Sequence, residues 1–175
     1  MYKEARFYGG SQEHSGALSE HFLLGSLHTD SKLYLPYREA VKLAKDLQQD
    51  NPVSPKKPFM RDLRDAIVRK MDFKGDKDAE RLKIYTAVGT PLDHYHKADM
   101  FVELEGEGGK NSKIATGDAT INKEKIADKD KKADVLIGEI PDPTESKEEY
   151  NFAVDELAEK FTAVLKAKTS FGGRA

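Results

Sequence analysis

Two aspartates near the middle of the sequence have the residue type and the spacing of a site for a divalent cation. Asp99 and Asp118 lie at similar distances on either side of Gly108 and Gly109, within alternating apolar residues that predict a β-hairpin. A Gly-Gly pair suits the type I′ turn of such a hairpin, because both central residues need a positive φ. Counting outward from this turn places Asp99 directly opposite Asp118.

The predicted pairing puts the two carboxylates on one face of the hairpin, with Cβ atoms about 5 Å apart. Like charges at that distance repel each other. Mg²⁺ or Mn²⁺ relieves the repulsion, because hard cations bind one or two carboxylates together with water and phosphate oxygens. The alternative is a register slipped by one residue, which leaves two solvated acids near the strand ends. The other pairs implied by this register include Glu107 with Lys110, Glu103 with Ile114, Phe101 with Thr116, and Lys97 with Thr120.

The composition is typical of one soluble domain. The chain has 175 residues, of which 38% are hydrophobic and 34% charged, and it contains no cysteine, which excludes disulfides, thiolate metal sites and cysteine nucleophiles. The net charge of −2 gives no overall attraction for nucleic acid, so such a partner needs a local basic patch. No apolar run suits a signal peptide or a membrane span, so we expect a cytoplasmic protein without membrane contact.

Helices are predicted first along the chain, then strands, then one long helix. The fold class is therefore α/β (α+β), with a mixed four-stranded sheet that contains an antiparallel hairpin and is flanked by helices. The hairpin face with Met100 and Val102 is the apolar one and is predicted to face the core. The single domain 1–175 is predicted to comprise an N-terminal arm at 1–14, a helical region at 15–71, a sheet region at 80–140 and a C-terminal helix at 146–168.

The helix predicted near residues 59–71 begins in the most basic stretch of the chain. Six basic and two acidic side chains lie between Lys56 and Lys70. Clustered positive charge of this kind binds nucleic-acid phosphates, whereas the alternative is a solvated helix face with internal Arg–Asp pairs. The residues predicted to contact nucleic acid are Lys56, Lys57, Arg61, Arg64 and Arg69.

An acid at the start of one strand, a hairpin and a second acid on the returning strand resemble the core of the PD-(D/E)XK nuclease superfamily. The resemblance covers roughly residues 59–140 and implies a helix, three strands, a further helix and a fourth strand. It implies an Mg²⁺-dependent endonuclease or exonuclease, or a degenerate domain that binds without cleaving. In this interpretation Asp99 and Asp118 hold the metal, and Glu80 is an additional acid from the preceding helix.

The chain departs from the superfamily motif at two positions. Ala98 stands where the motif has proline, and Thr120 stands where it has lysine. The lysine is expected to orient the attacking water and to stabilise developing charge. Lys97, opposite Thr120, or Lys123, just past the strand, would take its place; the alternative is that both are ordinary surface lysines.

Two further interpretations concern other parts of the chain. Residues 89–93 (GTPLD) predict a turn, and His94 and His96 follow it, but no third strong ligand for zinc is apparent, so we expect no zinc site. The alternative function is a non-catalytic binding or structural component of a larger protein assembly. Its docking segments would be the N-terminal arm, with Tyr2, Phe7 and Tyr8, and the C-terminal tail, with Phe171.

Overall fold

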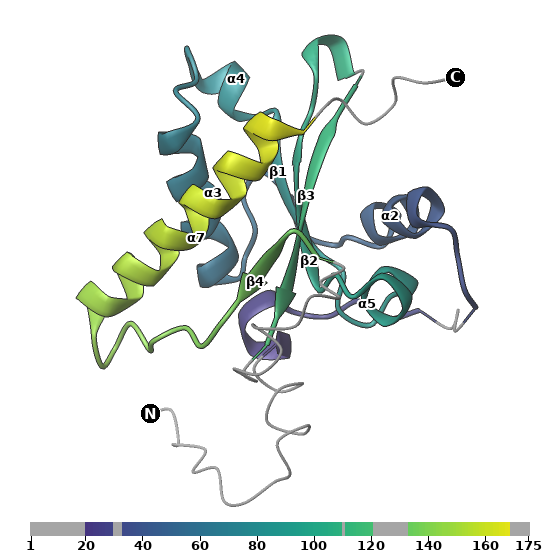
Figure 1. Ribbon diagram of the computed structural model, residues 1–175, viewed down its shortest axis with the longest axis horizontal. Helices are drawn as coiled ribbons and strands as arrows, with labels where there is room; N and C mark the ends of the chain where they lie inside the picture. Colours follow the sequence, from purple (N-terminus) through teal and green to yellow (C-terminus); the bar gives the residue numbers. More distant parts are fainter. Residues whose placement is uncertain (1–19, 30–32, 110, 121–132, 169–175) are drawn as a thin grey trace, which may run out of the picture.

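The computed structural model describes residues 20–29, 33–109, 111–120 and 133–168. The strands are β1 (Leu82–Thr86), β2 (Met100–Leu104), β3 (Lys113–Ala119) and β4 (Val135–Ile137). They form one sheet in the order β1-β2-β3-β4, in which β1, β2 and β3 pair antiparallel and β4 lies parallel to β3. Helices lie on both faces of the sheet (Figure 1), so the predicted fold class is confirmed.

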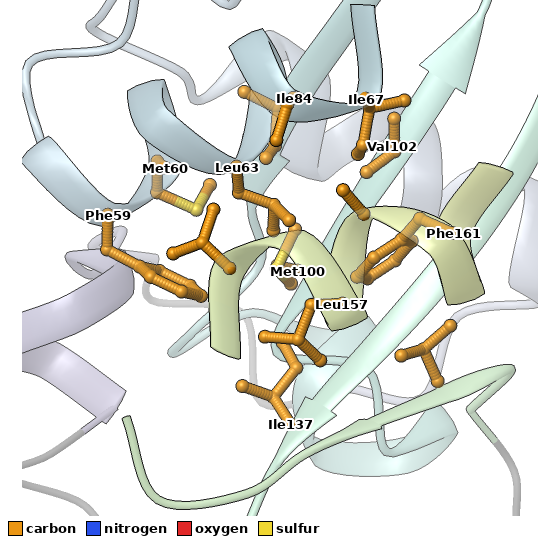
Figure 2. Close-up of a cluster of buried hydrophobic side chains, with 14 of the residues drawn as sticks. Phe59, Met60, Leu63, Ile67, Ile84, Met100, Val102, Ile137, Leu157 and Phe161 are labelled. Atoms are coloured by element: carbon orange, nitrogen blue, oxygen red, sulfur yellow. The ribbon is translucent and has the colours of Figure 1, made fainter. Parts of the chain in front are cut away.

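One face of the sheet is covered by α3 (Pro58–Lys70) and α7 (Lys147–Ala167), which pack side by side (Figure 1). Their apolar residues recur every three or four positions, so each helix presents one apolar stripe to the sheet. Figure 2 shows side chains of both helices converging on those of the strands, including Met100 and Val102 as predicted. No helix in the described ranges has the length and apolar character to span a membrane.

The opposite face of the sheet is also covered, by α2 (Tyr37–Asp46) and α5 (Pro91–His96). Tyr85 and Phe101 stack beneath these helices with ring centroids 4.8 Å apart. Glu103 is also buried on this side, where its carboxylate lies 2.7 Å from the ammonium group of Lys45. The hairpin face that carries the two aspartates is therefore buried along most of its length.

Helix α5 replaces the turn that was predicted at residues 89–93. The Thr90 hydroxyl caps the helix by accepting a hydrogen bond from the N–H of Leu92, and Pro91 occupies the first helical position, where its fixed φ is favourable. The helix ends at Lys97, which has the left-handed conformation with φ 55°. The chain therefore enters β2 from a helix rather than from an extended segment.

The register of the hairpin is the predicted one. Phe101 pairs with Thr116, and β2 and β3 keep this register over five residue pairs. Gly108 and Gly109 have the predicted positive φ, at 70° and 75°, within a short 3₁₀ turn (Glu107–Gly109). The predicted partner of Glu107 is residue 110, which lies outside the described ranges.

Gly117 occupies a close contact between the sheet and α7. A Cβ atom at this position would lie 3.0 Å from side-chain atoms of Met100 and Phe161, and 3.1 Å from the Cδ1 atom of Ile137. We expect Gly117→Ala to lower the free energy of unfolding by about 1–3 kcal/mol through overpacking. Urea denaturation checks this, with Gly138→Ala as the control, because nothing lies within 4 Å of a Cβ atom there. Equal losses in the two variants would contradict the tight contact.

Candidate carboxylate site

Asp99 and Asp118, here called the aspartate pair, lie at the end of the sheet where β2 begins and β3 ends. Met100 and Gly117 form the last residue pair of β2 and β3, so the next residues outward, Asp99 and Asp118, lie close to each other at this end of the sheet. The backbone of Asp99 is held on both sides: its N–H donates to the Gly117 carbonyl at 2.9 Å, and its carbonyl accepts from the Ala87 N–H at 2.7 Å. Asp118 is half-buried, and its charge acts on the Asp99 carboxyl.

The carboxyl group of Asp99 is enclosed by protein. Asp99 is 5% exposed, and one of its carboxylate oxygens accepts a hydrogen bond from the Ala119 N–H at 2.7 Å. Burial raises the pKa of Asp99 to about 9, the hydrogen bond from Ala119 opposes this rise, and the negative charges of Asp93, Glu20 and Asp118 add to it. At neutral pH the Asp99 carboxyl of the metal-free protein therefore keeps its proton.

The two other acids that act on Asp99 come from elements outside the hairpin. Asp93 lies in the first turn of α5, where a carboxylate oxygen accepts a hydrogen bond from the Gly89 N–H at 2.9 Å. Glu20 lies in a helical segment at residues 20–24. Neither acid was predicted from the sequence as a site residue. The capping pattern of Thr90 could have revealed the helix that positions Asp93, but no spacing in the sequence points to Glu20.

Glu80 does not join the aspartate pair. It follows α4 (Asp76–Ala79) and precedes the first residue of β1, Leu82, which pairs with the last residue of β2, Leu104. The aspartate pair lies at the other end of these strands. At about 3.3 Å per residue, the five residues of β1 separate the two ends by about 13 Å or more. The expectation that Glu80 supplies an additional metal ligand is therefore wrong for this arrangement.

The two lysines proposed to replace the motif lysine have different outcomes. Lys97 is exposed and ends α5, two residues before Asp99. Because the strand pairing begins only at Met100, Lys97 does not form the predicted strand pair with Thr120, whose N–H instead donates to the Ile137 carbonyl of β4 at 2.8 Å. Lys123 lies outside the described residues.

The basic residues at the start of α3 lie at the same end of the sheet as the aspartate pair (Figure 1). The ammonium group of Lys57 donates to carbonyls of the helical segment 20–24, which carries Glu20, at 3.1 and 3.2 Å. Lys56 is exposed and pairs with Asp50 at 2.9 Å. Arg61 and Arg69 are exposed as well. Three of these four side chains are exposed, and that of Lys57 is half-buried.

Arg64 differs from the other predicted nucleic-acid contacts. It is 7% exposed, and its guanidinium donates to the carbonyls of Leu82 at 2.9 Å and of Ala79 at 2.7 Å. Helical spacing turns this arginine toward the sheet, where it ties α4 and β1 to α3. The prediction that Arg64 contacts nucleic acid is wrong, because its donor groups are engaged inside the protein.

The described residues contain no group of three or more His, Asp, Glu or Cys side chains arranged to hold a metal ion. His94 is exposed on α5, and His96 has its Nε2 atom 2.8 Å from the carbonyl oxygen of Leu35. Mg²⁺ differs from such ions in its needs, because it keeps several water ligands and takes only one or two carboxylates together with substrate phosphate oxygens.

Comparisons with protein-family models, with curated proteins and with solved structures found no match to this chain. The predicted docking segments, the N-terminal arm 1–14 and the tail with Phe171, lie outside the described residues. The geometry of the aspartate pair therefore supplies the basis for a functional proposal.

Proposed function

We propose that this protein is a metal-dependent nuclease-like domain that hydrolyses nucleic-acid phosphodiesters, with Mg²⁺ or Mn²⁺ held by the aspartate pair. The observation that carries the proposal is the burial of Asp99 close to Asp118. A carboxyl whose pKa is raised by burial, and further by neighbouring acids, destabilises a fold, and such groups gather at functional sites. A divalent cation removes the conflict, because it replaces the proton of Asp99 and balances both charges.

A cation at the aspartate pair supplies two elements of phosphodiester hydrolysis. It polarises the phosphate, and it lowers the pKa of a bound water so that hydroxide forms near neutral pH. Asp93 and Glu20 add negative charge close to the pair, which favours a cation there. Lys97, exposed two residues before Asp99, and Lys123, just past β3, are the two lysines proposed to orient the attacking water.

The order of the elements supports the same proposal. The helix α3 precedes three antiparallel strands, the first acid lies at the start of β2, the second lies near the end of β3, and β4 follows parallel to β3. The helix, the three strands and the fourth strand follow the order that the resemblance to the PD-(D/E)XK superfamily implies, whereas α5 between β1 and β2 is an additional helix. The segment 121–132, where the resemblance implies a further helix, lies outside the described residues. Lys56, Lys57 and Arg61, at the beginning of α3 and just before it, are the side chains proposed to contact the phosphate backbone.

Titration with Mg²⁺ or Mn²⁺ is expected to raise the melting temperature of the wild type, since a ligand of the folded state stabilises it by mass action. Asp118→Asn is expected to lose this rise and to hydrolyse single-stranded DNA at least about 100-fold more slowly, because it removes half of the metal site. Calorimetry or dye-based melting measures the first effect, and a gel assay with a labelled oligonucleotide measures the second.

Glu80→Gln is the matched control for Asp118→Asn. It also removes one negative charge, but at the opposite end of β1, so it should keep both the cation effect and the hydrolysis rate. An unchanged melting temperature of the wild type at millimolar cation, or equal losses in the two variants, would count against a metal at the aspartate pair.

A further inference from the structure

A pocket next to the aspartate pair opens on the α2–α5 face of the sheet. Its volume is about 330 Å³, at the small end of the range for sites that bind small organic ligands. Most of its lining is aromatic. The residues that line it are Tyr34, Tyr37, Tyr95, His96 and Thr116.

The four rings contact one another around this space. The ring centroid of Tyr34 lies 5.5 Å from that of Tyr95 and 5.8 Å from that of His96, and the His96 centroid lies 5.6 Å from that of Tyr37. Tyr34 is 63% exposed, and the other three rings are half-buried. The rings are thus fixed against one another but keep surface open to solvent, which distinguishes them from a closed core.

The polar groups of the pocket belong to side chains that are held in place. The Leu35 carbonyl can only accept, so the Nε2 atom of His96, 2.8 Å away, carries a hydrogen and donates it. Burial, together with the charge of Asp134, raises the pKa of Tyr37 to about 12. The Thr116 hydroxyl donates to a carboxylate oxygen of Asp134 at 2.9 Å. Such walls suit a flat, uncharged ring with hydrogen-bonding edges.

Two connections place the pocket beside the aspartate pair. Thr116 precedes Asp118 by two residues on the same face of β3, which corresponds to about 7 Å along the strand. Tyr95 and His96 end α5, and the chain then passes through Lys97 to Asp99. One nucleotide can therefore place its base in the pocket and its phosphate at the carboxylates.

We propose that this pocket binds an unstacked nucleobase of a single-stranded nucleic acid. Every base has a face that stacks on aromatic side chains, so binding is expected to tolerate any sequence. A base inside a duplex is already stacked and paired, so the pocket favours single strands. That the bound base belongs to the substrate rests on the proposed function, whereas the binding of the base itself does not.

Nucleosides test the pocket without a metal, because they carry no phosphate. Adenosine and thymidine, titrated into the protein in EDTA and followed by two-dimensional NMR, are expected to shift the resonances of α5 and of Thr116, whereas ribose alone should shift none. Tyr95→Ala and Tyr34→Ala should each weaken nucleoside binding about 5- to 150-fold. Phe152→Ala removes an exposed aromatic ring on α7, outside the pocket, and should leave binding unchanged.

The outcomes separate this inference from the proposed function. Absence of nucleoside binding to the wild type, or equal binding by Tyr95→Ala and Phe152→Ala, overturns the base pocket even where Mg²⁺-dependent hydrolysis is found. Nucleoside binding in a protein whose stability and hydrolysis do not respond to Mg²⁺ supports the pocket and removes the proposed function. Where both hold, an abasic site moved along a single-stranded oligonucleotide should slow cleavage only at the bond next to it.

Discussion

Replacing Asp99 by asparagine is expected to stabilise the metal-free protein at pH 7 by about 3–5 kcal/mol, although Asp99 is buried and hydrogen-bonded. In the folded protein the Asp99 carboxyl has a pKa of about 9 and keeps its proton, whereas in the unfolded chain it ionises near pH 3.8. Ionisation of Asp99 therefore stabilises the unfolded chain at pH 7, and folding suppresses this ionisation. Asparagine cannot ionise, so it removes this stabilisation of the unfolded chain, and its side-chain oxygen can still accept the hydrogen bond from the Ala119 N–H.

The sign of the pH dependence follows from the same pKa difference. Below pH 3.8 the carboxyl is protonated in both states, so wild type and Asp99→Asn should be equally stable. Above it the folded wild type holds more protons than the unfolded chain, so its stability falls relative to the variant until the pH passes about 9. Urea denaturation of both proteins in EDTA between pH 4 and pH 9 measures this difference.

Mg²⁺ should reverse the order of stability of the wild type and Asp99→Asn. The wild type is expected to gain stability from the cation, since Asp99 then exchanges its proton for a metal, whereas Asp99→Asn should gain little and lose hydrolysis. Glu80→Gln, which removes an exposed acid at the opposite end of β1, should follow the wild type at every pH. A stability difference between Asp99→Asn and the wild type that stays constant with pH would contradict the raised pKa of Asp99.

The hairpin shows what the sequence could predict about this site. Alternating apolar residues and two adjacent glycines define a register, and a shift by one residue would expose Met100 and Val102 while burying charged neighbours. The structure has that register over five residue pairs, which end next to the two aspartates and bring them close together. Periodic apolar stripes likewise predicted α3 and α7, because local spacing alone determines which side of a helix is apolar.

The remaining site residues depend on contacts that are distant in the sequence. Glu80 precedes β1 and was predicted to lie near the two acids. The antiparallel pairing of β1 with β2 instead places it at the opposite end of these strands. Glu20 acts on Asp99 from the segment 20–24, which hydrogen bonds from Lys57 connect to the start of α3. The local sequence also did not indicate that Arg64 points into the protein, because the two carbonyls that it binds belong to α4 and β1, which follow α3 in the sequence.

Arg64→Met is expected to lower the free energy of unfolding by about 2–4 kcal/mol and to leave nucleic-acid affinity unchanged. The substitution keeps the aliphatic part of the side chain but removes hydrogen bonds from a charged donor to the buried carbonyls of Leu82 and Ala79, each worth about 1.5–3 kcal/mol. Part of this loss is recovered, because methionine has no buried guanidinium to desolvate. Urea denaturation measures the loss.

Arg61→Met is the matched comparison, three residues away on the exposed side of the same helix. It should change stability by no more than about 0.5 kcal/mol, but it should weaken binding of a labelled single-stranded oligonucleotide and reduce the slope of log affinity against log salt by about 1, as expected for one lost phosphate contact. Fluorescence anisotropy at several salt concentrations measures both. Loss of affinity in Arg64→Met with normal stability would mean that the guanidinium leaves the interior to bind phosphate, and would contradict the structural role assigned to it.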